Sequence, residues 1–197
     1  MVDLLIDMTE LHVDIHILNG RLPSEGHVVS RAQLLKEAYR IQDEAQQFVS
    51  TWGPLRVFHD ETGDIIPCRD QDDYAWAELT IFHWTTRLFL CQLIRRLHPI
   101  GTPVPTESLP SALIQKLAAA IPYFLGASTG MLGIHRVHFP LGLFLLILAE
   151  PNDATAKDRD AMISVLWDPL VQARTGKFLK GLGIGNIDFD AIARSEA

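Results

Sequence analysis

Residues 74–97 read YAWAELTIFHWTTRLFLCQLIRRL, and this stretch decides the fold. Placed at 100° per residue, as in an α-helix, its apolar side chains fall on two opposite faces. One face holds Leu79, Phe82, Phe89, Leu93 and Leu97, and the other holds Ala77, Ile81, Trp84, Leu88 and Cys91. A helix that is apolar on two sides needs other helices to cover both. The stretch therefore predicts an all-α fold, an irregular multi-helix stack around a central buried helix at about residues 73–97.

Two narrow polar seams separate the apolar faces of this predicted helix. They contain Glu78, Thr85, Gln92 and Arg96 on one line and Thr80, His83 and Arg87 on the other. His83 can serve as a general base with Asp72, Asp73 or Glu78 as its orienting carboxylate. We favour a structural role, in which His83 hydrogen-bonds a carbonyl or carboxylate inside the fold. We expect the seams to be water-exposed joints of a helical scaffold.

The composition predicts a single helical domain over residues 1–197, in a reducing intracellular compartment. The chain has 197 residues, of which 48% are hydrophobic, and this is enough for a sizeable core. Its formal net charge of −7 lacks the basic balance of a nucleic-acid-binding module, so we expect no direct DNA binding. The two cysteines, Cys68 and Cys91, are too few for a disulfide scaffold. The apolar run at residues 139–149 is about half of the roughly 20 residues that span a bilayer, so we expect no membrane insertion.

Apolar residues at three- and four-residue steps predict five further helices, at about residues 4–18, 30–52, 109–124, 137–149 and 156–173. Ser30 and Gln33 have the pattern of a capping box at the start of the second helix. Asn19-Gly20 and Gly53-Pro54 are typical helix ends. The N-caps expected for the later helices are Asp72 or Asp73, then Ser108, then Asp153 or Thr155.

Glycine and proline set the remaining structural expectations. Pro122 should kink or shorten its helix, residues 126–133 should form a flexible turn, and Pro140 should lie in a first helical turn. The last long helix should bend at Pro169, and its inner side should hold Ile163, Leu166, Trp167 and Leu170. We expect the helices at residues 30–52, 139–149 and 156–173 to cover the central helix. The tail at residues 176–197 should form short helical turns against the body.

Histidines supply the candidate metal and anion sites. His12 and His16 are four residues apart on a predicted helix, a spacing that lets two imidazoles bind one metal ion. We favour the alternative of a histidine pair on a solvated edge, because the sequence identifies no third ligand. His135, Arg136 and His138 follow a glycine-containing stretch, so a basic turn can in principle receive a phosphate or carboxylate there. Here we favour a turn that is flexible and has no ligand.

The sequence contains no pattern that predicts catalysis or a bound cofactor. It has no GxxxxGK[ST], HExxH, CxxC or nucleophile-elbow motif, and no GxGxxG after a strand. The basic C-terminal half of the central helix, with Arg87, Arg95 and Arg96, is explained by the helix dipole. We therefore expect no enzyme activity, no cofactor and no metal. A small metal-dependent helical enzyme that uses His12 and His16 is the least favoured alternative.

Three segments, taken in order, resemble one protein family. AELTIFHWTTRLFLCQLIRRL (residues 77–97) has an aromatic-Trp pair leading into a leucine-rich run. IPYFLGASTGMLGIHRVHFPLGLFLLILAE (residues 121–150) has a glycine-containing break and an FPL helix start, and VLWDPLVQARTGKFLKGL (residues 165–182) has a small-Gly-Lys-Phe ending. Together they resemble the C-terminal half of the fungal-specific transcription factor regulatory domain. In many fungal regulators this domain follows a six-cysteine binuclear zinc cluster.

This resemblance implies an all-helical, non-enzymatic, nuclear domain that takes part in ligand response, autoinhibition or dimer contacts. The chain is then either the C-terminal part of a larger regulatory domain that controls secondary-metabolite or nutrient genes, or a stand-alone relative that acts only through partners. It lacks the zinc-cluster motif and the basic segment before it, so the resemblance implies no DNA binding by this chain. We expect protein partners or self-association. An alternative, which can coexist with this function, is a small-molecule-binding helical protein whose pocket lies between the central helix and residues 139–149. Apart from the resemblance, the expected location is the cytoplasm.

Overall fold

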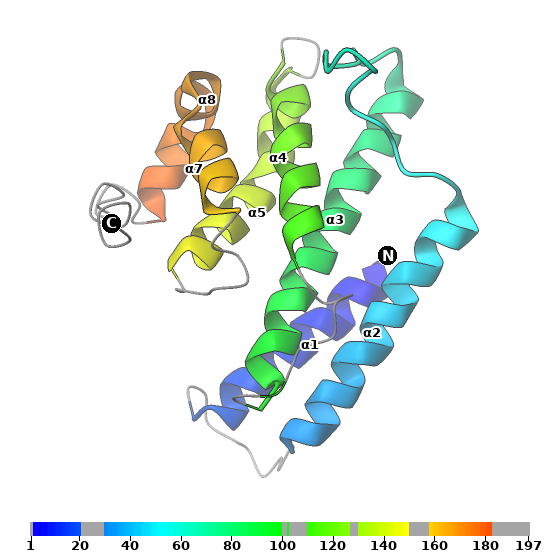
Figure 1. Ribbon diagram of the computed structural model, residues 1–197, viewed down its shortest axis with the longest axis vertical. Coiled ribbons are helices and arrows are strands. Elements are labelled where there is room, and N and C mark those ends of the chain that lie inside the picture. The colour runs from blue at the N-terminus through cyan, green and yellow to red at the C-terminus, as the bar shows by residue number, and fades with distance from the viewer. Residues whose placement is uncertain are drawn as a thin grey trace.

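Seven α-helices and their connections make up the part of the chain that the computed structural model describes, residues 2–20, 30–99, 102, 110–126, 130–149 and 158–182. The helices are α1 (Val2–Leu18), α2 (Arg31–Trp52), α3 (Gln71–Leu97), α4 (Ser111–Leu125), α5 (Gly130–Ala149), α7 (Arg159–Trp167) and α8 (Pro169–Gly181). Within these ranges there is no strand, only an isolated bridge between His59 and Ile65. The predicted all-α class is confirmed (Figure 1).

Helix α3 is the central element, and its two ends belong to two different apolar cores (Figure 1). Toward its N-terminal end α3 packs against α4 and α5, which are in turn covered by α7 and α8. The side chains that α3 gives to this first core are Ala77, Ile81, Trp84, Leu88 and Cys91. They are one of the two apolar faces predicted from the sequence, and all five are buried.

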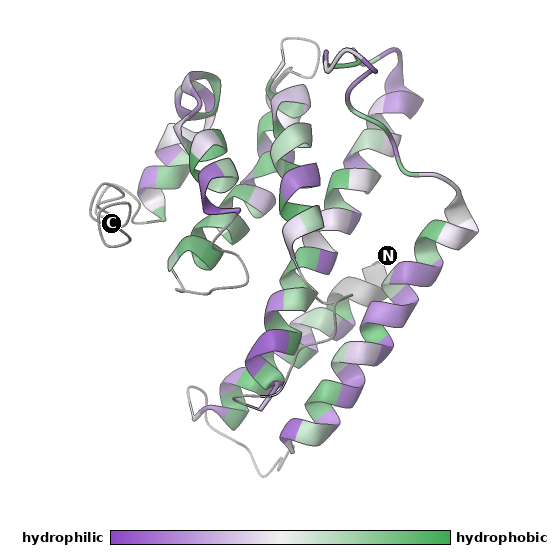
Figure 2. Cartoon of the chain, viewed as in Figure 1, coloured by the Kyte–Doolittle hydropathy of each residue, from purple (hydrophilic) through white to green (hydrophobic). Residues whose placement is uncertain are grey.

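The second core lies at the C-terminal end of α3, between α1 and α2. Here α3 contributes Leu90, Leu93, Ile94 and Leu97, α1 contributes Met8, Leu11 and Ile15, and α2 contributes Leu34, Ala38, Ile41 and Ala45. Figure 2 shows polar and apolar residues alternating along α2, as expected of a helix with one buried face. The other predicted face of α3 is therefore divided, because Leu93 and Leu97 are buried whereas Leu79 and Phe82 are only half-buried.

The expectation of water-exposed polar seams on α3 is wrong for most of their residues. Thr80, His83 and Thr85 have no exposed surface, and Gln92 is 5% exposed. The two threonine hydroxyls donate to backbone carbonyls one turn earlier, Thr80 to Trp76 at 2.8 Å and Thr85 to Ile81 at 2.7 Å. Short side chains that hydrogen-bond their own helix can be buried at little cost.

The segment between α2 and α3 is held to the first core by a buried arginine. The guanidinium of Arg56 donates to the Asp73 carboxylate at 2.8 Å and lies over the Tyr123 ring, 4.6 Å from its centroid. This pair occupies Asp73, and the cap of α3 is instead Asp70, whose carboxylate accepts from the Asp73 N–H at 2.8 Å. The expected cap at Asp72 or Asp73 is therefore wrong.

The helix ends around α2 are those expected. Ser30 and Gln33 form the reciprocal capping box, with the Ser30 N–H donating to the Gln33 side chain at 2.9 Å. The helix ends at Gly53, whose φ of 93° lies in the region that favours glycine. Helix α1 ends before Gly20, which has a φ of 67°. The predicted caps Ser108, Asp153 and Thr155 and the tail after residue 182 lie outside the described residues.

Helix α5 is longer than predicted, which changes the place of its basic residues. It begins at Gly130 instead of near residue 137, so His135, Arg136 and His138 lie on a helix and not in a turn. Pro140 accordingly lies inside the helix instead of in its first turn, and Pro122 lies inside α4, which continues to Leu125. None of the described helices is long and apolar enough to cross a bilayer.

The predicted last long helix is two helices. The chain breaks at Asp168, whose carboxylate accepts from the N–H groups of Leu170 at 2.8 Å and Val171 at 3.2 Å and so caps α8. Trp167 and Leu170, expected on the inner side, are 56% and 41% exposed because of this break. Helices α7 and α8 pack mainly on α4, α5 and each other, and α4 takes the place on α3 that residues 156–173 were expected to fill.

Candidate functional site

A cleft of about 480 Å³ lies between α3 and α5. The α3 wall includes Glu78, Leu79 and Phe82, and the α5 wall includes His135, Arg136 and Phe139. Leu79 and Phe82 are half-buried, and neither is among the residues of the two cores. The cleft has the size and the mixed apolar and polar lining of a small-molecule site.

The polar end of this cleft is an ion pair between its two walls. Arg136 Nη2 and Glu78 Oε1 lie 2.5 Å apart, and their side chains are 47% and 30% exposed. An ion pair with this exposure adds little to stability, because water screens it. It does fix a guanidinium at the mouth of the cleft, next to the exposed His135.

A second, more apolar groove of about 390 Å³ begins on the other side of Phe139. It is lined by α5 residues that include His138, Leu143 and Leu146, by Phe89 of α3, and by Phe178 and Leu182 at the end of the chain that the structure describes. The Phe139 ring borders both hollows and lies 6.3 Å from the Phe89 ring, edge to face. The two hollows therefore share one aromatic wall.

Helix α8 forms one side of the groove because it lies along α5. The His138 imidazole stacks on the Phe178 ring, with 4.0 Å between ring centroids and 18° between planes. One turn further along, a Cβ built on Gly142 would lie 3.9 Å from the Leu182 side chain. Burial, and then the neighbouring His135, hold the pKa of His138 below its ordinary value, so this imidazole is largely neutral near pH 7.

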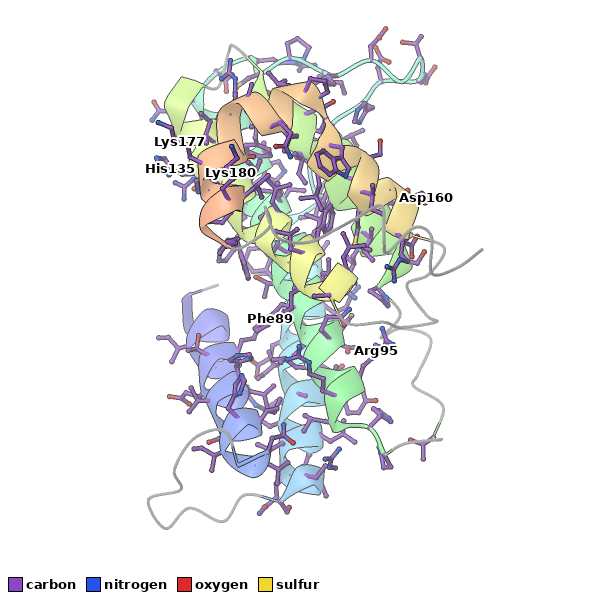
Figure 3. The ribbon with its side chains drawn as sticks, turned by 90° about the vertical axis from the view of Figure 1, so that its left-hand side faces the viewer. Phe89, Arg95, His135, Asp160, Lys177 and Lys180 are labelled. Carbon is purple, nitrogen blue, oxygen red and sulfur yellow. The ribbon has the colours of Figure 1, made fainter. Side chains whose placement is uncertain are left out.

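The basic residues near these hollows come from two helices. Figure 3 shows His135 of α5 and Lys177 and Lys180 of α8 toward the same edge of the molecule. All three are exposed, as is Arg136. The stacking of His138 on Phe178 places the two helices side by side at this edge. A chain with a net charge of −7 thus carries a local cationic rim here.

The two histidines of α1 are close enough to share a ligand, but the described residues place no third metal-ligating side chain beside them. His12 Nε2 and His16 Nε2 lie 3.0 Å apart, and the His12 ring lies 5.3 Å from Phe89. Burial, His16 and the guanidinium of Arg96 lower the pKa of His12. Among the described residues, no group of three or more His, Cys, Asp or Glu side chains is placed to hold a metal. The pair has the geometry of a histidine–histidine hydrogen bond.

His83 differs from the structural histidine predicted at its position. Its ring is fully buried and stacks on Phe48 at 5.8 Å, and within the described ranges neither ring nitrogen has a hydrogen-bond partner. The predicted hydrogen bond to a carbonyl or carboxylate is therefore wrong. Burial, with smaller contributions from Arg87 and Lys116, lowers the pKa of His83 to about 4. Asp73, one of its suggested orienting partners, pairs with Arg56.

Sequence reasoning placed a pocket between the central helix and residues 139–149, and the α3–α5 cleft lies along that contact but nearer the start of α5. It did not include Phe178 and Leu182, which it assigned to the tail at residues 176–197 and not to the end of a helix that lies along α5. The spacing of His135 and Phe139, four residues apart, is the signal that would have placed both on one wall once that segment was recognised as helical. No protein-family model matches the chain, and no curated protein or solved structure is significantly similar to it.

Proposed function

We propose that this protein is a non-catalytic regulatory and interaction domain whose state is set by a small molecule bound between α3 and α5. The observation that carries the proposal is the cleft of about 480 Å³ between these helices, with an Arg136–Glu78 ion pair at one end and apolar side chains along the rest. A cleft that presents one oriented charged pair and a mainly apolar wall is suited to binding and not to bond cleavage.

The position of the cleft supports a regulatory role. Its α3 wall belongs to the helix that also carries the core with α1 and α2, so an occupant of the cleft contacts the element that both cores share. The sequence resemblance to fungal transcription factor regulatory domains is the reason to place the protein in gene regulation. It is also the reason to propose a nuclear location and protein partners or self-association.

A ligand screen with one blocking variant tests this function. Thermal unfolding of the full chain is followed with representative small molecules of several metabolite classes, for wild type and for Ala75→Trp, because Ala75 lines the cleft. The control is Ala112→Trp, an exposed position on α4 that lines neither hollow. A ligand at about 100 times its Kd should stabilise wild type and the control by about 2.7 kcal/mol.

The expected result is at least one class that stabilises wild type and the control but not Ala75→Trp. The proposal fails if no class stabilises the protein, or if every stabilising ligand acts equally on all three proteins. A fusion of the full chain to an unrelated DNA-binding module provides the regulatory measurement. Reporter output from the wild-type fusion should change when the same ligand is added. Output from a fusion that carries Ala75→Trp should not change.

A further inference from the structure

We propose that the ligand of the α3–α5 cleft is an amphipathic anion, with a carboxylate or phosphate at the Arg136 end and an alkyl or acyl chain that passes Phe139 into the apolar groove. This inference rests on the proposed function and adds the chemical class of the ligand. It joins three features of the structure: a cationic rim, an aromatic wall shared by two hollows, and exposed apolar side chains in the second of them.

The cationic rim favours a negatively charged group. His135, Lys177 and Lys180 are exposed on the same edge (Figure 3), and Arg136, the neighbour of His135 in α5, is also exposed, whereas the chain as a whole has a charge of −7. Glu78 accepts from one guanidinium nitrogen of Arg136, and a guanidinium has five N–H donors. An oxyanion can therefore share Arg136 with Glu78 or replace it. Exchange of one half-exposed carboxylate for another costs little.

The groove beyond Phe139 favours a hydrocarbon chain. Apart from His138, whose imidazole is largely neutral, the residues around it are apolar. Three of them are large and incompletely covered: Phe139 is 41% exposed, Leu146 is 37% exposed and Leu182 is 52% exposed. A chain laid over them removes this surface and its own surface from water.

The distance between the two ends sets the shape of the ligand. Arg136 and Leu146 are ten positions apart on one helix, which is about 15 Å at 1.5 Å per residue. A compact anion that fills only the Arg136 end leaves the groove empty, and a neutral hydrocarbon makes no use of the N–H donors of Arg136. A sugar or nucleotide finds few hydrogen-bonding groups in the groove. Only a molecule with a charged head and an extended apolar chain matches both ends.

Calorimetric titration of the full chain with matched amphiphiles tests the proposal. The probes are octanoate, decanoate and dodecanoate, dodecyl phosphate, and dodecanol as the neutral counterpart, all below their micelle concentrations. Affinity should rise with chain length by up to about fourfold per methylene, as expected for burial of a methylene group. Dodecanoate or dodecyl phosphate should bind about tenfold or more tightly than dodecanol, as expected for a charge-assisted contact.

Three variants separate the two parts of the ligand. Arg136→Gln should abolish the preference for the anion and keep the chain-length dependence. Gly142→Phe fills the groove, so it should abolish the chain-length dependence and keep the preference for the anion. If this variant does not fold, Leu146→Gln at an exposed groove position replaces it. Lys36→Gln removes an exposed cation on α2 and should change neither property.

The outcomes distinguish the ligand class from the function. If the metabolite screen finds a ligand blocked by Ala75→Trp while none of the amphiphiles binds, the amphipathic-anion proposal is overturned and the proposed function stands. If amphiphiles bind but Arg136→Gln and both groove variants leave the titrations unchanged, the site assigned here is wrong. Sedimentation with vesicles of phosphatidylcholine alone and with added phosphatidylserine is the membrane arm. Binding to vesicles without binding to monomeric dodecanoate would replace the small-molecule proposal with a membrane surface.

Discussion

Replacement of His83 with leucine should remove a large pH-dependent part of the free energy of unfolding. The imidazole of His83 is fully buried, and burial lowers its pKa from 6.5 to about 4 in the folded protein. Between these two values the unfolded chain binds a proton that the folded chain excludes. Protonation therefore favours unfolding, and the stability of the wild-type protein should fall as the pH falls through this window.

The size of this effect follows from the two pKa values. A shift of this extent is worth about 3 kcal/mol once the pH is below both values, at 1.36 kcal/mol per pH unit. Between about pH 7.5 and about pH 5, the linkage relation gives a loss of about 2 kcal/mol. This is a substantial fraction of the 5–15 kcal/mol that is typical of a domain.

Urea unfolding followed by far-ultraviolet circular dichroism at these two pH values measures the loss. His83→Leu should lose about 2 kcal/mol less than wild type on going to the lower pH. His12 and His138 also have lowered pKa values, but they are present in both proteins and cancel in the comparison. His83→Gln should show the same reduced pH dependence, because it too removes the titrating group while keeping a polar side chain.

The charge next to His83 provides a finer check. Arg87→Gln removes the larger of the two electrostatic contributions that lower the pKa of His83, so the pH-dependent loss should shrink but not vanish. The reasoning is refuted if wild type and His83→Leu lose the same free energy between the two pH values, within about 0.5 kcal/mol. That result would mean that a partner stabilises the charged imidazole in the folded protein.

Three further predictions concern the first core. Trp84→Ala should cost about 3–5 kcal/mol in urea unfolding, because this 8% exposed side chain packs edge to face on another buried ring, and a loss below about 1 kcal/mol would contradict its burial. Arg56→Met should cost about 3 kcal/mol by leaving the Asp73 carboxylate without its cation, whereas a neutral result in the same assay would show that the pair is dispensable. Burial raises the pKa of Cys91 to about 11, so in the native protein a thiol reagent should modify the half-buried Cys68 first; equal rates for the two would show that α3 opens readily.

The parts of the fold that could be predicted are those with local causes. The two apolar faces of α3 follow from its residue order, and the start of α2 follows from one serine and one glutamine. The break between α7 and α8 also has a local cause that periodicity alone concealed. Asp168 is a strong N-cap and precedes a proline, a context that disfavours helical backbone.

The sequence did not predict the start of α5, because the local helix propensity there is unfavourable whereas the packing of α5 on other helices is favourable. Two glycines, Gly130 and Gly133, each disfavour a helix by about 1 kcal/mol, so the sequence indicates a turn. In the folded protein Gly133 is buried, and the contacts of α5 with α3, α4 and α8 outweigh this cost. The candidate site requires α5 to begin before His135, because His135 and Arg136 face the cleft only from a helix. Its groove required contacts between α5, α8 and Phe89, which no local pattern encodes.

The use of one helix by two cores limits how α3 can move. Leu88 belongs to the first core and Leu90 to the second, and Phe89 between them packs against both. A rotation of α3 about its own axis that improves the fit on one side must therefore turn side chains out of register on the other. Closely packed interiors respond to such a displacement by changing to another discrete arrangement and not by gradual deformation. A molecule that rotates α3 from the α5 side would consequently change the packing of α1 and α2 on α3, although it contacts neither helix.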